Sequence, residues 1–310
     1  MQDNPYIEAT STSEVKVLFL KKLAILIMMK LLIVVTLLLL AFSYSAISYV
    51  RFYHYIGNAD LKSPYINQST ILNNSTGDGF IKYVALGDSL SAGVGSNTIE
   101  NTFPYQYAQN LLNKYENENV DLINLAQSGA TTDDVINNQI QKTIDEQPDF
   151  ITLLIGINDI HNKRTIDDFN KKYQLIINEL LTKTNAKIII INLPYLGSNQ
   201  IVYPPFNFLL NFRTKQFNSE ISNIVNNYSG NSRISFADLY NSTYSISKDD
   251  PKYYSSDLFH PSENGYLIWS KIINYRELTH AVCCNARFVS YSSYPATLRS
   301  GYFARIINAN

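Results

Sequence analysis

The sequence predicts an α/β domain, in which helices cover both faces of a parallel β-sheet, behind a single membrane-spanning helix. From Ile81 onward, short apolar runs rich in β-branched residues alternate with longer amphipathic stretches. Continuous apolar runs are typical of strands buried on both faces, and their alternation with helices is typical of parallel sheets. Near the N-terminus, residues 31–50 carry no charge, and this stretch is long enough to cross a hydrocarbon core of about 30 Å as a helix.

The N-terminal apolar stretch predicts a signal anchor that spans the membrane over residues 23–50. Four lysines precede its charge-free part, at positions 16, 21, 22 and 30, whereas only Arg51 and Lys62 follow soon after it. The positive-inside rule therefore places residues 1–22 in the cytoplasm and the following domain outside the cell, on a single-pass protein of the cell membrane. A cleaved signal peptide is the alternative. We favour the anchor because the apolar region of a signal peptide is shorter, about 7–15 residues, and Ser43-Tyr44-Ser45 is a poor cleavage site.

The rest of the chain divides into three parts by composition. Residues 51–80 are polar and rich in Asn, Ser and Tyr, so we expect a stalk or linker between the membrane and the domain. Residues 81–275 hold the alternating strands and helices of the domain. Residues 276–310 contain no lysine but both cysteines, Cys283 and Cys284, so this tail differs from the rest and its origin stays open.

Each element of the α/β domain is predicted from its own stretch of sequence. Five short apolar runs predict strands, at residues 82–86, 120–124, 150–155, 187–192 and 233–236. Amphipathic stretches predict helices, at residues 105–115, 132–144, 166–181, 209–226 and 263–275. In the third helix, Thr165 is a suitable N-cap, and apolar residues from Phe169 to Leu180 recur at helical spacing, which indicates a stripe that faces the core.

Composition argues against two classes of function. The net charge is -1, and no block of basic residues occurs in the domain. A nucleic-acid partner is therefore not expected, because phosphate binding needs a concentrated Lys/Arg surface. The two cysteines are adjacent, which excludes a spaced zinc site, and the scattered His and acidic residues form no closed ligand set. We therefore expect neither a metal nor another cofactor.

The most informative stretch is the corner Gly87-Asp88-Ser89, where the first predicted strand ends. Three interpretations compete: a phosphate-binding loop, a catalytic nucleophile and an ordinary turn. A P-loop needs a Gly-Lys-Ser/Thr ending, but no lysine occurs between Lys82 and Lys114, and the glycines lack the register of a dinucleotide-binding fingerprint. The corner also differs from the Gly-x-Ser-x-Gly elbow, because position 91 is serine. A nucleophile and a plain turn remain.

A serine nucleophile needs a base, and histidine is scarce in this chain. Of the four histidines, His54 lies in the expected stalk, His280 in the tail and His161 after the third strand. His260 follows Asp257 by three residues, between the last strand and the last helix, so one turn can bring the carboxylate to the imidazole. An Asp-x-x-His pattern by itself more often marks a surface turn or half a metal site.

Two further corners follow predicted strands at the same edge of the sheet. Gly129, after the second strand, can bring a backbone N–H close, and Asn158, after the third, offers a side-chain amide. A tetrahedral intermediate needs such donors for its oxyanion. Singly these are weak signals, since Gly and Asn after a strand usually mark a turn. Together with the corner serine they form an ordered set on neighbouring strand ends.

These motifs resemble the four blocks of the SGNH (GDSL) hydrolase family, in the same order and at the same strand ends. The matching residues are Gly87-Asp88-Ser89-Leu90, Gly129, Gly156-Ile157-Asn158-Asp159 and Asp257-Leu258-Phe259-His260-Pro261. The resemblance covers residues 81–275. It implies a flavodoxin-like three-layer α/β/α sandwich with a five-stranded parallel sheet, here in a membrane-anchored lipase or esterase.

The same resemblance implies a role for each motif residue. Ser89 would be the nucleophile, His260 the base and Asp257 the acid that orients the base. The backbone N–H groups of Ser89 and Gly129 and the side chain of Asn158 would form the oxyanion hole. The expected reaction is hydrolysis of a carboxylic ester through an acyl-serine intermediate, without a metal or cofactor.

The resemblance leaves several substrates open. We favour lipid or lysophospholipid esters, because the apolar segment 201–210 follows the fourth strand and can form a wall near the site, although packing against a helix explains it equally well. An O-acetyl ester on a cell-wall glycan is the alternative. A non-catalytic module that binds glycans or proteins on the same scaffold is less favoured, because binding alone does not require Ser89, Asp257 and His260 together. The motifs specify no oligomeric state.

Overall fold

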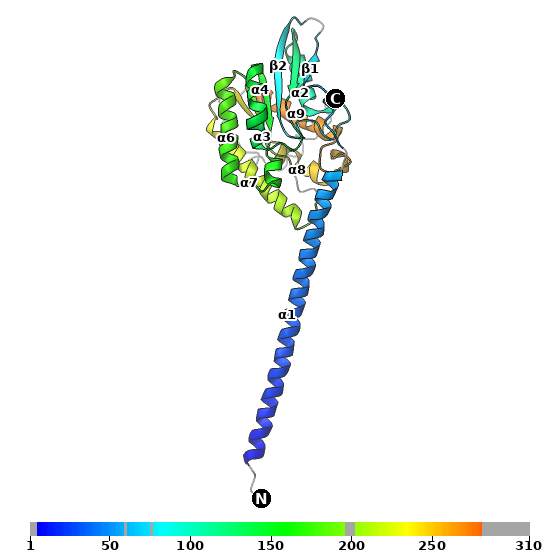
Figure 1. The fold of residues 1–310 in the computed structure, drawn as a ribbon, viewed down its shortest axis with the longest axis vertical. Coiled ribbons are helices and arrows are strands. Elements are labelled where there is room, and N and C mark those ends of the chain that lie inside the picture. Colours follow the sequence, from blue (N-terminus) through cyan, green and yellow to red (C-terminus); the bar gives the residue numbers. More distant parts are fainter. Residues whose placement is uncertain (1–4, 59–60, 75–76, 196–201, 281–310) are drawn as a thin grey trace.

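The computed structural model describes residues 5–58, 61–74, 77–195 and 202–280, which form a long N-terminal helix and an α/β domain (Figure 1). In chain order the elements are α1 (Pro5–Asn58), β1 (Ser69–Leu72), β2 (Gly79–Gly87), η1 (Ile99–Asn101), α2 (Phe103–Lys114), β3 (Glu118–Asn124), α3 (Thr132–Asp134), η2 (Val135–Gln139), α4 (Ile140–Glu146), β4 (Phe150–Leu154), α5 (Ile157–His161), α6 (Ile166–Lys183), β5 (Lys187–Ile191), α7 (Phe206–Asn227), β6 (Ile234–Ala237), α8 (Leu239–Asp249), η3 (Pro251–Tyr253) and α9 (Glu263–His280).

The sheet has six strands in the order β1-β3-β2-β4-β5-β6. The strands from β2 to β6 are parallel, in the order typical of flavodoxin-like folds, which confirms the predicted α/β class and its five parallel strands. The sheet is mixed, however, because β1 pairs antiparallel with β3 at the edge, with Ser69 opposite Ile123. This sixth strand lies within residues 51–80, where the sequence indicated a stalk. It has four residues, of which only Leu72 is buried, so it has no clear apolar pattern.

Helices cover both faces of the sheet. α2 and α9 pack together on one face, whereas α4, α6 and α7 lie on the other (Figure 1). α6 shows why the sequence folds this way, because its predicted stripe from Phe169 to Leu180 is fully buried. Its N-cap is also as expected, since Thr165 Oγ1 accepts the N–H of Asp168. β4, at the centre of the sheet, is buried over its whole length, as its nearly continuous apolar run predicts.

The expected helix over residues 132–144 is present but is divided into three parts. A short α-helical turn, α3, is followed by the π-helical segment η2 and then by α4. Short π-helical segments occur mostly as single turns within α-helices, frequently at functional sites. η2 ends at Gln139, a buried residue whose contacts lie at the candidate site.

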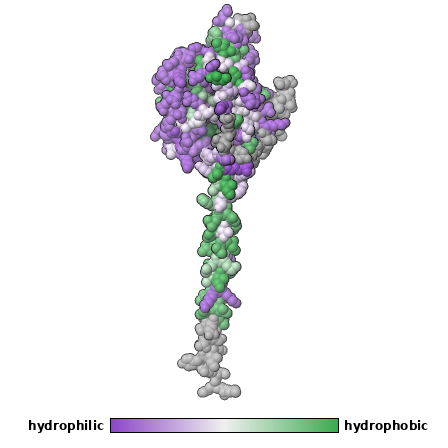
Figure 2. Space-filling model, turned by 45° about the vertical axis from the view of Figure 1, so that its right-hand side comes forward, coloured by the Kyte–Doolittle hydropathy of each residue, from purple (hydrophilic) through white to green (hydrophobic). Residues whose placement is uncertain are grey.

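The helix α1 extends from the domain as a long rod (Figure 1). Within the described residues, its segment Val15–His54 is long and apolar enough to cross a membrane (Figure 2). A signal sequence near the N-terminus meets the same criteria of length and hydropathy, so this property alone fits either an anchor or a signal.

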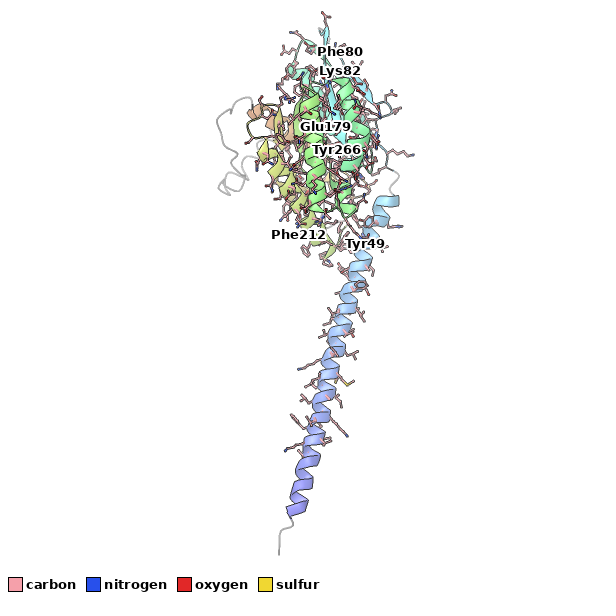
Figure 3. All side chains as sticks on the ribbon, turned by 60° about the vertical axis from the view of Figure 1, so that its left-hand side comes forward. Tyr49, Phe80, Lys82, Glu179, Phe212 and Tyr266 are labelled. Carbon is pink, nitrogen blue, oxygen red and sulfur yellow. The ribbon has the colours of Figure 1, made fainter. Side chains whose placement is uncertain are left out.

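The last turns of α1 pack on the domain. Phe52 is fully buried there. Ser48 Oγ accepts the backbone N–H of Tyr203 at 3.0 Å and donates to the carbonyl of the same residue at 3.1 Å. Tyr49 lies at this junction, at the end of the domain from which α1 projects (Figure 3). The first part of the expected stalk is therefore helical. At the other terminus α9 continues to His280, and residues 281–310 of the expected tail lie outside the described residues.

Candidate active site

The corner after β2 presents Ser89 at the carboxyl edge of the sheet. Gly87 has a φ of +144°, and a Cβ placed there would lie 2.2 Å from the carbonyl oxygen of Leu154 on the neighbouring strand. Only glycine fits this position. Asp88 is buried, and its Oδ1 accepts the N–H of Leu90 at 3.0 Å. These contacts turn the chain sharply and leave Ser89 half-buried at the surface of a cavity.

Gln139, at the end of η2, holds this corner through two hydrogen bonds to the backbone of Gly87. Its Nε2 donates to the carbonyl of Gly87 at 2.8 Å, and its Oε1 accepts the N–H of the same residue at 3.0 Å. The side chain is fully buried. Sequence reasoning missed this residue, since a glutamine in an amphipathic helix normally faces solvent. It positions the strand end that carries Ser89.

Ser89, His260 and Asp257 form a continuous hydrogen-bonded chain. His260 Nε2 lies 2.9 Å from Ser89 Oγ, and His260 Nδ1 lies 2.5 Å from Asp257 Oδ2. Ser89 and His260 come from segments 171 residues apart in the sequence. A hydroxyl with a neutral imidazole on one side and a carboxylate behind that imidazole can lose its proton to the ring as it attacks.

A tight turn holds Asp257 against the imidazole. Its Oδ1 accepts the Ser255 hydroxyl at 2.8 Å and the backbone N–H groups of Phe259 and His260 at 2.9 Å each. Leu258, between Asp257 and Phe259 in this turn, has a φ of +58°, an unusual value for a leucine. Burial alone would raise the pKa of Asp257, but the hydrogen bonds from His260 and from the turn outweigh burial and lower the pKa below its usual value. The carboxylate is therefore ionised where it faces the ring.

Gly129 and Asn158 line the same cavity as Ser89, Asp257 and His260. The volume of this cavity is about 280 Å³. Gly129 has a φ of +82°, and a Cβ there would meet no atom within 4 Å, so the backbone beside Ser89 is open. Asn158 Nδ2 donates one N–H to the carbonyl of Ala130 at 2.9 Å, which fixes the amide and leaves its second N–H for a ligand. The structure thus brings together all five residues that the sequence singled out.

A buried network of hydrogen bonds and ion pairs fixes the positions of Gly129 and Asn158 relative to each other. Asp159, next to Asn158, accepts the N–H of Thr132 at 3.0 Å and its hydroxyl at 2.7 Å, which ties α5 to α3. Arg164 contacts Asp159 and reaches Asp133 at 2.5 Å. Burial raises the pKa of Asp159, while Thr132 and the Arg164 charge oppose that rise. The loop with Gly129 and the helix with Asn158 are therefore fastened to one another just outside the cavity.

The other described histidines have different surroundings. His161 lines the same cavity as Ser89, and its Nδ1 lies 3.3 Å from the hydroxyl of Tyr53 in α1. Burial lowers the pKa of His161 to about 4, so the ring is neutral near pH 7. The side chain of His54, near the end of α1, is exposed. Within the described part of the chain, no group of three or more His, Cys, Asp or Glu residues is arranged to hold a metal ion.

The family model that matches the chain describes a GDSL-like lipase/acylhydrolase, and it covers residues 85–268. The match includes every motif residue named above. No sequence among the curated proteins matches the chain.

Solved structures of similar fold include three hydrolases. A variant of an acetyl xylan esterase from Geobacillus stearothermophilus has a TM-score of 0.52 at 20% identity, over 64% of this chain and 95% of that one. An extracellular lipase from Streptomyces rimosus has a TM-score of 0.52 at 16% identity, over 63% and 99%. A lipase/acylhydrolase from Enterococcus faecalis has a TM-score of 0.52 at 21% identity, over 65% and 96%. At such identities the likeness establishes a shared fold.

Proposed function

Because the chain belongs to the GDSL-like lipase/acylhydrolase family, we propose that it hydrolyses carboxylic esters through an acyl intermediate on Ser89. The hydrogen-bonded chain from Ser89 through His260 to Asp257 is the observation that carries this proposal. A binding module on the same scaffold has no need of this geometry, since recognition does not require a hydroxyl aligned with a base.

The reaction follows from the positions of these groups. Ser89 Oγ attacks the ester carbonyl carbon while its proton passes to His260 Nε2, and Asp257 stabilises the imidazolium. The N–H groups of Ser89 and Gly129 and the free N–H of Asn158 donate to the oxygen that becomes negative. The tetrahedral intermediate collapses as His260 returns the proton to the leaving alkoxide. Water then attacks the acyl-serine by the same route, releasing the acid and free Ser89.

We propose that α1 is retained as a membrane anchor. The buried side chain of Phe52 packs between the rings of Phe206 and Phe259, with centroid distances of 5.6 and 5.7 Å, and stacks on His161. Cleavage ahead of this residue would leave an apolar side chain at a new, loose N-terminus, whereas the continuous helix holds it in place. The lysine distribution before the span supports a domain outside the cell.

For the substrate we propose a lipid or lysophospholipid ester. A membrane anchor next to the catalytic cavity favours a substrate that is itself concentrated in the bilayer. An O-acetyl group on a cell-wall glycan is the second candidate, supported by the acetyl xylan esterase among the similar folds.

The test is an ester panel with the full-length protein in detergent. p-Nitrophenyl esters from acetate to palmitate, a lysophospholipid and an acetylated xylan are each assayed with wild type and Ser89→Ala. Wild type should hydrolyse at least one class with a rate that the alanine variant lacks, while both proteins melt at similar temperatures. Equal hydrolysis by Ser89→Ala would reject the serine mechanism.

A further inference from the structure

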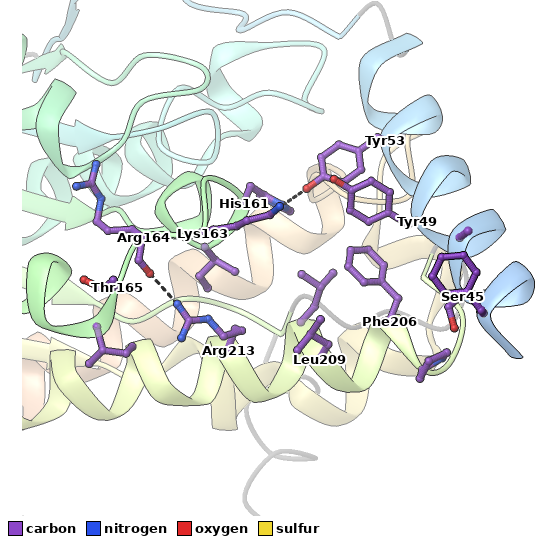
Figure 4. A pocket seen from close by; sticks show the side chains of 16 residues that line it. Ser45, Tyr49, Tyr53, His161, Lys163, Arg164, Thr165, Phe206, Leu209 and Arg213 are labelled. Carbon is purple, nitrogen blue, oxygen red and sulfur yellow. Dashed lines mark hydrogen bonds between the residues drawn. The ribbon is translucent and has the colours of Figure 1, made fainter. Parts of the chain in front are cut away.

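A second cavity, larger than the catalytic one, lies between α1 and the first turns of α7 (Figure 4). Its volume is about 920 Å³. One wall comes from one face of α1, where the lining residues have the helical spacing i, i+3, i+4, i+7 and i+11: Phe42, Ser45, Ala46, Tyr49 and Tyr53. The opposite wall comes from the segment around Phe206 and Leu209. We call this cavity the α1–α7 groove.

The groove and the catalytic cavity are neighbours with a shared boundary. Tyr53 and His161 line both of them, and the Tyr53 hydroxyl meets His161 Nδ1 at this boundary. His161 is neutral near pH 7 because burial lowers its pKa, so no charge separates the two spaces. An acyl chain attached to a carbonyl at Ser89 would pass these two uncharged rings to enter the groove.

The groove also lies at the end of the apolar span that adjoins the domain. Its lining residues on α1 belong to the outward end of the apolar span, and Tyr44, Tyr49 and Tyr53 there resemble the aromatic belt of membrane interfaces. Beside them, Phe208, Leu209 and Phe212 of α7 are between 56% and 65% exposed. Tyr49 and Phe212 lie at the same end of the domain (Figure 3). Exposed apolar side chains of this size are favourable where lipid covers them.

We propose that the α1–α7 groove binds the acyl chain of a membrane lipid ester, with the anchor helix itself as one wall of the substrate site. This inference rests on the proposed ester hydrolysis at Ser89. The ester reaches Ser89 while the far end of its acyl chain stays along α1, so the lipid need not leave the bilayer completely. The anchor then determines acyl-chain preference as well as location.

Lipid is favoured over a protein or glycan occupant by the position and chemistry of the groove. A glycan would need polar partners along the walls, but the α1 wall and the Phe206–Leu209 wall are mostly aromatic and aliphatic. The cationic residues Lys163, Arg164 and Arg213 lie at the end away from α1 (Figure 4). An apolar helix of another protein would bind along α1 but would gain nothing from the passage to Ser89.

The experiment narrows the groove from each wall in the full-length protein. Ala46→Trp fills it from α1 and Leu209→Trp fills it from α7. Ile47→Trp is the matched control, because Ile47 is exposed on α1 and does not line the groove. kcat/KM is measured in detergent for p-nitrophenyl esters from acetate to palmitate. Each methylene that loses its contact costs about a fourfold factor, so displacing two should lower the palmitate-to-acetate ratio at least about tenfold in both groove variants.

Labelling rates provide a second readout. A long-chain alkyl fluorophosphonate should label Ser89 more slowly in Ala46→Trp and Leu209→Trp than in wild type, relative to a short-chain one, whereas Ile47→Trp should keep the wild-type ratio. Unchanged ratios in both groove variants, with hydrolysis that still depends on Ser89, would overturn the groove and leave the proposed function standing. Hydrolysis that persists in Ser89→Ala would instead remove the proposed function.

Discussion

Replacement of Asn158 by alanine separates two contributions of its side chain, one structural and one proposed. One N–H donates to the carbonyl of Ala130 at 2.9 Å, and in the proposed mechanism the other donates to the oxyanion. Loss of the first bond should lower the free energy of unfolding by about 1 kcal/mol. Loss of the second should raise the activation free energy by about 3–4 kcal/mol, a fall in kcat of about 10²–10³-fold. KM should change far less, because the oxyanion develops after binding.

The assay measures kcat, KM and the thermal midpoint on one preparation of Asn158→Ala in detergent. Asn162→Ala is the matched control, because Asn162 follows α5 on an exposed position and should leave kcat near wild type. Fluorophosphonate labelling of Ser89 should slow as well, since that reaction also develops negative charge on oxygen. A lowered midpoint with a normal kcat would refute the reasoning and make Asn158 a purely structural residue.

Three further substitutions test the groups behind the nucleophile. Gln139→Met leaves the N–H of Gly87 without its buried acceptor, which should lower the free energy of unfolding by about 1–3 kcal/mol. It should also lower kcat about tenfold or more, because the strand end that carries Ser89 shifts. A normal kcat in a steady-state assay would contradict this. Asp257→Asn should lower kcat by about 10³–10⁴-fold in the same assay, because the ring loses its orienting charge, and a loss below tenfold would remove Asp257 from the triad. Burial raises the pKa of Asp88 to about 7, so between about pH 4 and 7 the folded protein holds a proton on Asp88 that the unfolded chain releases. The contribution of Asp88 to stability therefore falls as pH rises through this window, by on the order of 4 kcal/mol. Asp88→Asn should flatten that part of the pH profile in urea unfolding, and an unchanged slope would place its origin elsewhere.

The parallel sheet was predictable because each of its strands has a recognisable apolar pattern in its own stretch of sequence. β4 and β5 are nearly continuous apolar runs, and α6 has five buried positions at helical spacing, so the sequence itself indicates strands buried on both faces and a helix that covers them. β1 was not predictable in the same way. It is a short edge strand with one exposed face, and its pairing with β3 depends on a partner about fifty residues away.

The clustering of the five candidate residues was predictable, because Ser89, Gly129 and Asn158 follow strands and because Asp257 and His260 keep a recognisable spacing. Their supporting contacts were not. Gln139 looks like an ordinary helical glutamine, and only the three-dimensional structure shows that it meets Gly87 across 52 positions of sequence. Likewise, the apolar character of α1 predicts a membrane span. Nothing in that composition predicts that Tyr53 contacts His161, which lies 108 residues further along the chain.

The most direct test of the account is the identity of the residue that carries the acyl group. Full-length protein is treated with a fluorophosphonate, digested and mapped by mass spectrometry, with Ser89→Ala and His260→Ala in parallel. We expect one adduct in wild type, on Ser89, none in Ser89→Ala, and labelling slowed about 10³-fold or more in His260→Ala, because the base is lost. An adduct on any other residue, or an equal rate without His260, would contradict the account.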